Sequence, residues 1–267
     1  MADKYPGTQA VTRAIHLLKL FDDDKPVWSL NDLSETAQLN KTTTFRILSA
    51  LEHEGLLRRT PEGNYRLGSE MVAMGGRAMR SNELRTVSHA YIRELSQTTK
   101  ETVTLETLHI SQNNPRDTAV DNQWHMLVID ETLSQYRVGI SQFIGSRLPV
   151  YASSTGRAVL AHLPEEMRVE YLTFTRTPFT DNTVITQENL KKEIQKVRKQ
   201  GFAIVKSEIE VGLIAVGAPI FDLNGEVRSA ISVVVPSFRV KRGDLPELAK
   251  RVVSTASDIS HRLGYRR

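Results

Sequence analysis

The apolar pattern at the start of the chain predicts three short helices. Between residues 8 and 21 the apolar positions stand three or four residues apart, which is the spacing of a helix with one buried face. A second helix is predicted over residues 30–37, with Ser29 as its N-cap and Asp32 in its first turn. Asn40 is the expected N-cap of a third helix, so residues 38–40 form a tight turn.

The third helix, over about residues 41–54, is predicted to have one apolar and one polar side. At about 100° per residue, the residues expected to face the core are Thr44, Ile47, Leu48 and Leu51. The residues on the opposite side are Thr42, Arg46, Ser49 and His53. Most polar helix faces are simply solvated, and in isolation this stripe has the same interpretation.

The residues after this helix change that interpretation. Two short runs, 56–60 and 65–67, flank the turn-forming segment 61–64 and predict a β-hairpin that carries arginines. Three helices followed by a basic hairpin form a winged helix-turn-helix. Residues 41–67 have a net charge of only +2, so the placement of the cations near the start of the helix matters more than their number.

Polar and basic side chains of this kind bind phosphates and base edges in a major groove. The residues predicted to contact DNA are Ser29, Lys41, Thr42, Thr43, Thr44, Arg46, Ser49, Arg58, Arg59, Tyr65 and Arg66.

These residues also carry a resemblance to a known family. Residues 30–37, the run 39–48, Leu51, Gly55 and the hairpin end 65–68 resemble the IclR family of bacterial transcription regulators, and the resemblance extends through nearly the whole chain. It implies a DNA-binding N-terminal domain and a GAF-like effector domain. It also implies self-association to a dimer or tetramer, and repression as the more frequent mode of action.

The rest of the chain predicts an α+β fold. Helices are expected over residues 69–81, where Gly75 and Gly76 suggest a close contact or a hinge, and over 83–98, where one face carries Leu84, Val87, Ala90, Tyr91 and Leu95. Strands are expected at 102–110, 125–130, 136–140, 201–205, 213–221 and 227–235, and further helices at 155–162, 187–200 and 245–263. Residues 112–123 are polar and aperiodic, and are predicted to form an extended loop whose role the sequence does not indicate.

The expected organisation is a winged helix-turn-helix over residues 1–68, a linker helix over 69–81, and an effector domain with an antiparallel sheet over 82–267.

A ligand is expected in the second domain. Residues 145–157 end at a predicted helix start, where free N–H groups favour an anion, although Ser154 as a simple cap explains the same pattern. The resemblance implies that the ligand-binding residues are Arg137, Ile140, Ser154, Thr155, Val205, Leu213, Ala215 and Ser232. Since several are apolar and Arg137 can bind a carboxylate, the expected effector is a small organic acid with an apolar body. An exposed strand arginine is the alternative for Arg137.

Composition excludes several other classes. The 267 residues include 40% apolar and 25% charged residues with a net charge of +4, which is ordinary for a globular protein. The absence of cysteine excludes disulfides, thiolate zinc ligands and a cysteine nucleophile. Residues 1–14 lack the apolar core of a signal peptide, and the longest uncharged apolar run, 211–221, is too short to span a bilayer, so a cytoplasmic protein is expected.

Catalysis is not expected. The seven histidines show no paired spacing for zinc, and neither a nucleophile elbow nor a phosphate-binding loop is present, so no metal or cofactor is predicted. The expected function is a DNA-binding regulator, more often a repressor, of a catabolic operon with a near-palindromic operator. A winged-helix adaptor for protein contacts is the alternative, and an enzyme is the less favoured one.

Overall fold

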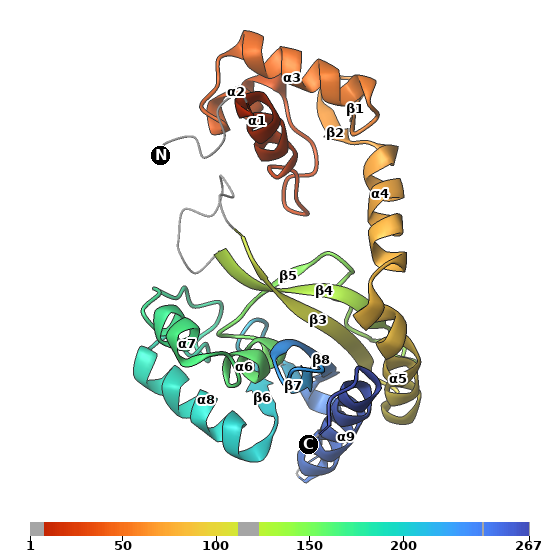
Figure 1. Ribbon diagram of the computed structural model, residues 1–267, viewed down its shortest axis with the longest axis vertical. Helices are drawn as coiled ribbons and strands as arrows, with labels where there is room; N and C mark the ends of the chain where they lie inside the picture. Colours follow the sequence, from red (N-terminus) through yellow and green to blue (C-terminus); the bar gives the residue numbers. More distant parts are fainter. Residues whose placement is uncertain (1–7, 112–122, 242, 267) are drawn as a thin grey trace. The chain divides into compact units, whose positions relative to one another are not determined.

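The structure, a computed structural model, describes residues 8–111, 123–241 and 243–266 (Figure 1). The described residues divide into two compact units, one that ends at Ser81 and one that begins at Asn82. Of the loop predicted over residues 112–123, all but Gln123 lie outside the described residues. None of the described helices is both long and apolar enough to cross a bilayer.

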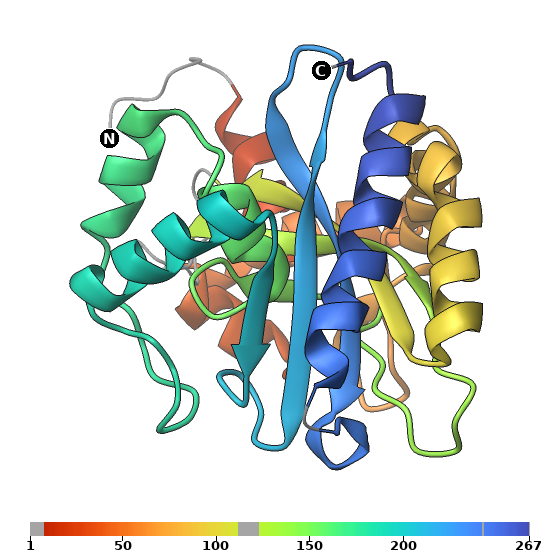
Figure 2. The ribbon, with the colours of Figure 1, turned by 90° about the horizontal axis from the view of Figure 1, so that it is seen from below.

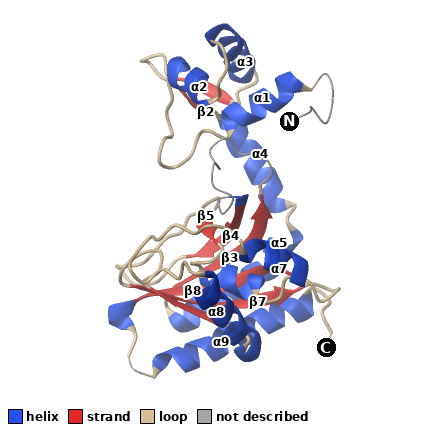
Figure 3. Cartoon of the chain, turned by 90° about the vertical axis from the view of Figure 1, so that its left-hand side faces the viewer, coloured by secondary structure: helices blue, strands red, loops and turns tan. Residues whose placement is uncertain are grey.

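The N-terminal unit contains the predicted helices and hairpin (Figure 3). Its elements are α1 (Gln9–Leu18), α2 (Leu30–Thr36), α3 (Lys41–His53), β1 (Leu57–Arg59), β2 (Tyr65–Leu67) and α4 (Ser69–Arg80). The two predicted N-caps are confirmed, because the Ser29 hydroxyl accepts a hydrogen bond from the Asp32 amide and the Asn40 side chain accepts one from the Thr43 amide.

Helix α3 separates its two sides as predicted. Thr44, Leu48 and Leu51 are buried in a core that also contains Leu17, Leu33 and Trp28. On the opposite side Thr42, Arg46 and His53 are exposed and Ser49 is half-buried. The polar stripe therefore faces away from the unit's own interior.

Helix α4 contains no buried residue, and Val72 is 77% exposed. A Cβ added at Gly75 would meet nothing within 4 Å. Of the two explanations for the paired glycines, a close contact with the described residues is therefore not found at Gly75.

The C-terminal unit is built on one antiparallel sheet, in which the described strands follow the order β5-β4-β3-β8-β7-β6. The strands are β3 (Thr102–Ile110), β4 (Trp124–Thr132), β5 (Arg147–Pro149), β6 (Ala203–Lys206), β7 (Leu213–Phe221) and β8 (Val227–Pro236). Helices α5 (Glu83–Thr99) and α9 (Asp244–Arg262) lie side by side on one face (Figure 2). Helix α6 (Ser154–Leu160) packs on the other, followed by α7 (Glu165–Leu172) and α8 (Gln187–Gln200).

The two helical layers give the sheet a hydrophobic core on each face. One contains Ile92 of α5 and Val252 of α9, and the other contains Leu160 of α6 and Leu190 of α8. Because both faces are covered, the central strands β7 and β8 have nearly continuous runs of buried residues. The α+β class is confirmed.

Several predicted elements are wrong in detail. Residues 136–140 form a loop and not a strand, with Tyr136 and Val138 exposed. The sheet instead gains the edge strand β5, and helix α7 was not predicted. On α5 the buried residues include Ser88 and Ile92, whereas Ala90, predicted to face the core, is exposed.

Two glycines allow α6 to lie close to its neighbours. A Cβ at Gly217 of β7 would lie 2.7 Å from the carbonyl carbon of Ser154 and 2.9 Å from its oxygen. A Cβ at Gly156 would lie 2.3 Å from the carbonyl oxygen of Val150. These contacts set the position of α6 against the sheet, because backbone atoms cannot move aside as a flexible side chain can.

Gly217→Ala is expected to lower the free energy of unfolding by at least about 2 kcal/mol, since the added methyl group overpacks the contact with Ser154. Thermal unfolding followed by circular dichroism measures the effect. Gly75→Ala adds the same methyl group to an open helix position and is expected to be neutral or stabilising by up to about 1 kcal/mol. Equal Tm values for the two variants would contradict the proposed close contact.

Candidate functional site

Unpaired cations accompany the polar stripe of α3. Lys41 and Arg46 are exposed, and no carboxylate of the described residues lies within ion-pair distance of either. Arg46 also lines a groove between α1 and α3, together with Thr43 and Val11. These positive charges are therefore free to meet an external anion.

The hairpin adds a second pair of cations. Arg58 and Arg66 stand directly opposite each other across the two strands, and both are exposed. Like charges at paired positions are destabilising. Within the described chain no carboxylate forms an ion pair with Arg58 or Arg66, so a bound phosphate would relieve their repulsion.

Arg59 connects the hairpin to α3. Its guanidinium donates to the Glu52 carboxylate at 3.1 Å and to the Tyr65 hydroxyl at 2.8 Å, and lies 5.7 Å from the centre of the Phe45 ring. Phe45 is 46% exposed on α3, a feature that the sequence did not identify. Arg59 therefore holds the hairpin in place beside the polar stripe, in addition to its predicted role.

Two residues predicted to contact DNA are not available for it. The Thr44 side chain is fully buried and donates to the Asn40 carbonyl at 3.1 Å, while Tyr65 is only 2% exposed and packs in the core. Their burial corrects both predictions. Ser29 is half-buried, and its hydroxyl accepts from the Asp32 amide at 3.1 Å.

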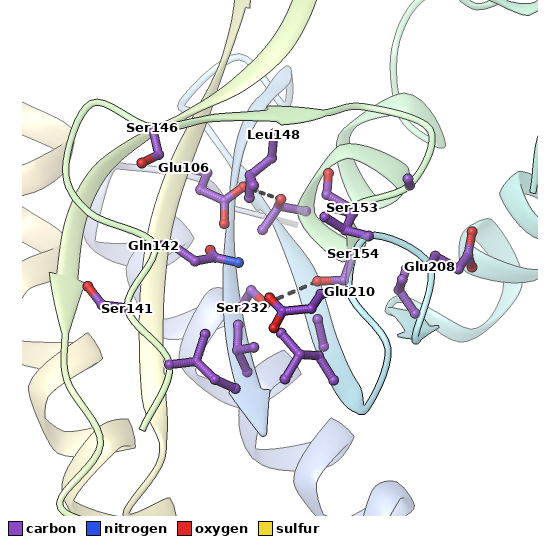
Figure 4. A pocket seen from close by; sticks show the side chains of 18 of the residues that line it. Glu106, Ser141, Gln142, Ser146, Leu148, Ser153, Ser154, Glu208, Glu210 and Ser232 are labelled. Atoms are coloured by element: carbon purple, nitrogen blue, oxygen red, sulfur yellow. Dashed lines mark hydrogen bonds between the residues drawn. The ribbon is translucent and has the colours of Figure 1, made fainter. Parts of the chain in front are cut away.

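The C-terminal unit contains a cavity of about 230 Å³ between α6, the sheet and the loop that precedes β5 (Figure 4). All but one of the residues predicted to bind a ligand line this cavity. Those that do are Ile140, Ser154, Thr155, Val205, Leu213, Ala215 and Ser232.

Arg137 is the exception. It lies in an exposed loop and does not line the cavity, which argues against the expected contact between its guanidinium and a ligand carboxylate there. The loop residues that reach the cavity come later and include Ser141 and Gln142, whose side chain points inward in Figure 4.

A buried carboxyl group, Glu106 of β3, forms part of the cavity wall. The hydroxyls of Thr104 and Thr155 donate to its two oxygens, Thr104 at 2.8 Å. Burial raises the pKa of Glu106 from 4.5 to about 7, and the two hydrogen bonds only partly oppose this shift. Glu106 was not predicted from the sequence, although a glutamate inside an apolar strand is the signal that points to it.

The serines at the start of α6 have separate roles. Ser153 is the N-cap, since its hydroxyl accepts from the Gly156 amide at 3.1 Å. The Ser154 hydroxyl lies 3.0 Å from that of Ser232 on β8 (Figure 4). The N-cap of α6 is therefore Ser153 and not Ser154.

A buried ion pair fixes the far wall of the cavity. Arg157 of α6 donates to both oxygens of Glu208, at 2.7 and 2.5 Å, and to the Tyr151 carbonyl at 2.8 Å. Because Glu208 and Glu210 follow β6, this pair holds the segment that carries Glu210. Neither Arg157 nor these glutamates were predicted from the sequence.

The described residues contain no cluster of three or more histidine, aspartate or glutamate side chains suited to a metal ion.

Comparisons with known proteins cover both units. The family model described as "Bacterial transcriptional regulator IclR C-terminal" matches residues 76–261, and the "IclR helix-turn-helix domain" model matches residues 10–61. The "HTH-type transcriptional regulator Rv1719" of Mycobacterium tuberculosis is 31% identical over 254 residues, which cover 95% of this chain and 92% of the relative. The "Transcriptional repressor IclR" of Escherichia coli (strain K12) is 27% identical, with 94% of this chain and 89% of the relative covered.

Solved structures show the same fold. A transcriptional regulator from Alicyclobacillus acidocaldarius superimposes with a TM-score of 0.81 at 25% identity, covering 96% of this chain and 98% of the other. An IclR homolog from Microbacterium hydrocarbonoxydans, complexed with 4-hydroxybenzoate, gives a TM-score of 0.77 at 23% identity, with coverages of 96% and 99%.

Glu106→Gln is expected to weaken the pH dependence of stability. The folded protein retains a proton on Glu106 that the unfolded chain releases above pH 4.5, so the wild type loses stability as pH rises from 4.5 to about 7. The variant lacks this loss. We therefore compare the free energy of unfolding of the variant with that of the wild type at each pH. This difference should be about 3 kcal/mol more in favour of the variant at pH 8 than at pH 4, at about 1.36 kcal/mol for each pKa unit.

Urea unfolding at both pH values measures this difference. The matched control is Glu210→Gln, because the Glu210 side chain is exposed and solvent screens its charge. A Glu106→Gln effect that is the same at both pH values would contradict the assignment of the buried proton.

Proposed function

This chain belongs to the IclR family of bacterial transcriptional regulators, and on that premise we propose that it represses a catabolic operon until a small molecule enters the cavity of its C-terminal unit. The family consists of DNA-binding regulators and not of enzymes. Relatives named as repressors, such as the Escherichia coli protein, support repression over activation. The observation that carries the proposal is the outward stripe of α3 beside four unpaired cations.

In the proposed complex, α3 enters the major groove and the hairpin contacts the flanking backbone. Thr42, Arg46 and Ser49 meet base edges and phosphates, with Lys41 and Thr43 at the start of the helix. Arg58 and Arg66 bind phosphates, Arg59 positions the hairpin, and Ser29 stands at the start of α2. Buried Thr44 and Tyr65 act only through the core.

The proposed organisation keeps the winged helix-turn-helix at residues 1–68, the linker helix at 69–81 and the effector domain at 82–267. A near-palindromic operator requires two DNA-binding units, so we propose a dimer or tetramer. The exposed apolar residues of α1 and α4, among them Val11, Ile15 and Val72, support contacts between copies there. Because a bacterial operon is regulated in the cytoplasm, we propose that location for the protein.

The effector is proposed to bind in the cavity between α6 and the sheet. Apolar walls formed by Val205, Leu213 and Ala215 suit an apolar body, and the hydroxyls of Ser154 and Ser232 suit a polar group. The homolog complexed with 4-hydroxybenzoate supports the predicted class of effector, a small organic acid, whereas the position of Arg137 outside the cavity argues against it. A ligand changes the DNA affinity only by the difference between its affinities for the DNA-binding state and for the state that releases DNA. This difference is typically about 1–3 kcal/mol.

Arg46→Ala is expected to weaken binding to the DNA flanking the gene by roughly tenfold and to reduce the slope of log affinity against log salt by about 1, since one phosphate contact is lost. Fluorescence anisotropy at several salt concentrations measures both quantities. Lys196→Ala, which removes the same charge from the exposed face of α8, is the control and should leave the slope unchanged. Equal slopes for the two variants would show that Arg46 does not contact a phosphate. Absence of DNA binding at low salt would favour the alternative of a winged-helix adaptor for protein contacts.

Ala215→Phe is expected to fill the cavity and abolish the response to the effector without weakening DNA binding. Anisotropy with operator DNA and extracts of small metabolites, compared between wild type and variant, measures the response. Val169→Phe, an exposed position on α7 outside the cavity lining, controls for the added ring. A full response retained by the Ala215 variant would place the effector elsewhere.

A further inference from the structure

We propose that the effector of this cavity is a molecule that donates hydrogen bonds and carries no negative charge, such as a polyol, an alcohol or a primary amine. This inference rests on the proposed function, because it defines the chemistry of the ligand for the cavity already described. It replaces the small organic acid with a ligand whose polar groups complement those of the wall.

The charged groups of the lining are all carboxylates. Among the described residues that form the wall, these are Glu106, Glu208 and Glu210, and the lining contains no lysine, arginine or histidine. The guanidinium of Arg157, which binds the lining residue Glu208, also donates to the Tyr151 carbonyl. A ligand carboxylate would therefore meet negative charge with no side-chain cation to balance it.

Several hydroxyl donors of the wall are also occupied. Thr155 donates to Glu106, and the Ser141 hydroxyl donates to Glu131 at 3.0 Å. The hydroxyls of Ser154 and Ser232 bond to each other. The protons of Thr155 and Ser141, and one proton of the Ser154–Ser232 pair, are therefore used within the protein, whereas the hydroxyl oxygens keep lone pairs that can accept hydrogen bonds.

Acceptors remain without partners. The side-chain oxygen of Gln142 is buried and has no hydrogen bond. The Glu210 carboxylate points toward the same space in Figure 4 and forms no ion pair with the described residues. The lack of a partner for the buried Gln142 oxygen is costly, and a ligand that donates a hydrogen bond to it removes this cost. The exposed Glu210 carboxylate offers the same ligand a charge-assisted hydrogen bond.

The test compares ligands that share a body and differ in one group. The probes are benzoate, benzyl alcohol and benzylamine, and gluconate with glucitol, each titrated into the full chain at pH 8 by calorimetry. We expect the alcohol, amine or polyol to bind at least tenfold more tightly than the acid of the same body. Glu210→Gln should weaken the amine several-fold and leave the alcohol nearly unchanged, because only the amine carries a charge.

Two further variants separate the outcomes. Glu166→Gln removes an exposed carboxylate of α7 outside the cavity lining and should change no affinity. If the acid of each pair binds more tightly, and Ala215→Phe abolishes that binding, the inference on ligand class is overturned while the cavity remains the effector site. If Ala215→Phe changes no affinity, the proposed function of the cavity fails as well.

Discussion

The close approach of α6 to the sheet is the constraint on which the effector site depends. Gly217 and Gly156 leave no room for a Cβ, so the backbone of Ser154 lies directly against β7. That contact brings the Ser154 hydroxyl to Ser232 and the Thr155 hydroxyl to Glu106. The ion pair between Arg157 and Glu208 then joins the same helix to the segment after β6. Helix α6 thereby fixes the parts of the cavity wall formed by β8, by β3 and by the segment after β6. A ligand in the cavity contacts this tightly packed helix.

Much of the fold follows from local pattern. The bounds of β3, β7 and α8 agree with the sequence prediction, because apolar residues recur in the two strands and stand at helical spacing in α8, at Leu190, Ile194 and Val197. Residues 136–140 also alternate apolar and polar side chains, but they have no neighbouring strand and form a loop. Strand β5 is three residues long and ends in proline, so its existence depends on pairing with β4 and not on local preference.

The two sites differ in how much of them the sequence reveals. The polar stripe of α3 belongs to a single helix, so the helical period alone separates exposed Thr42 from buried Thr44. The cavity joins residues far apart in the chain, and its glutamates were not predicted because charged residues are usually assigned to the surface. The resemblance located most of the lining, including Ile140, but Arg137 of the same segment lies in an exposed loop outside the cavity.

In the proposed mechanism, the DNA-binding surface and the cavity are energetically coupled. The most direct test is calorimetric titration of an effector, found by thermal shift, into the free protein and into its complex with operator DNA. Because coupling is reciprocal, the account predicts an effector Kd about 5- to 150-fold weaker for the DNA complex. Identical Kd values in the two titrations would contradict it.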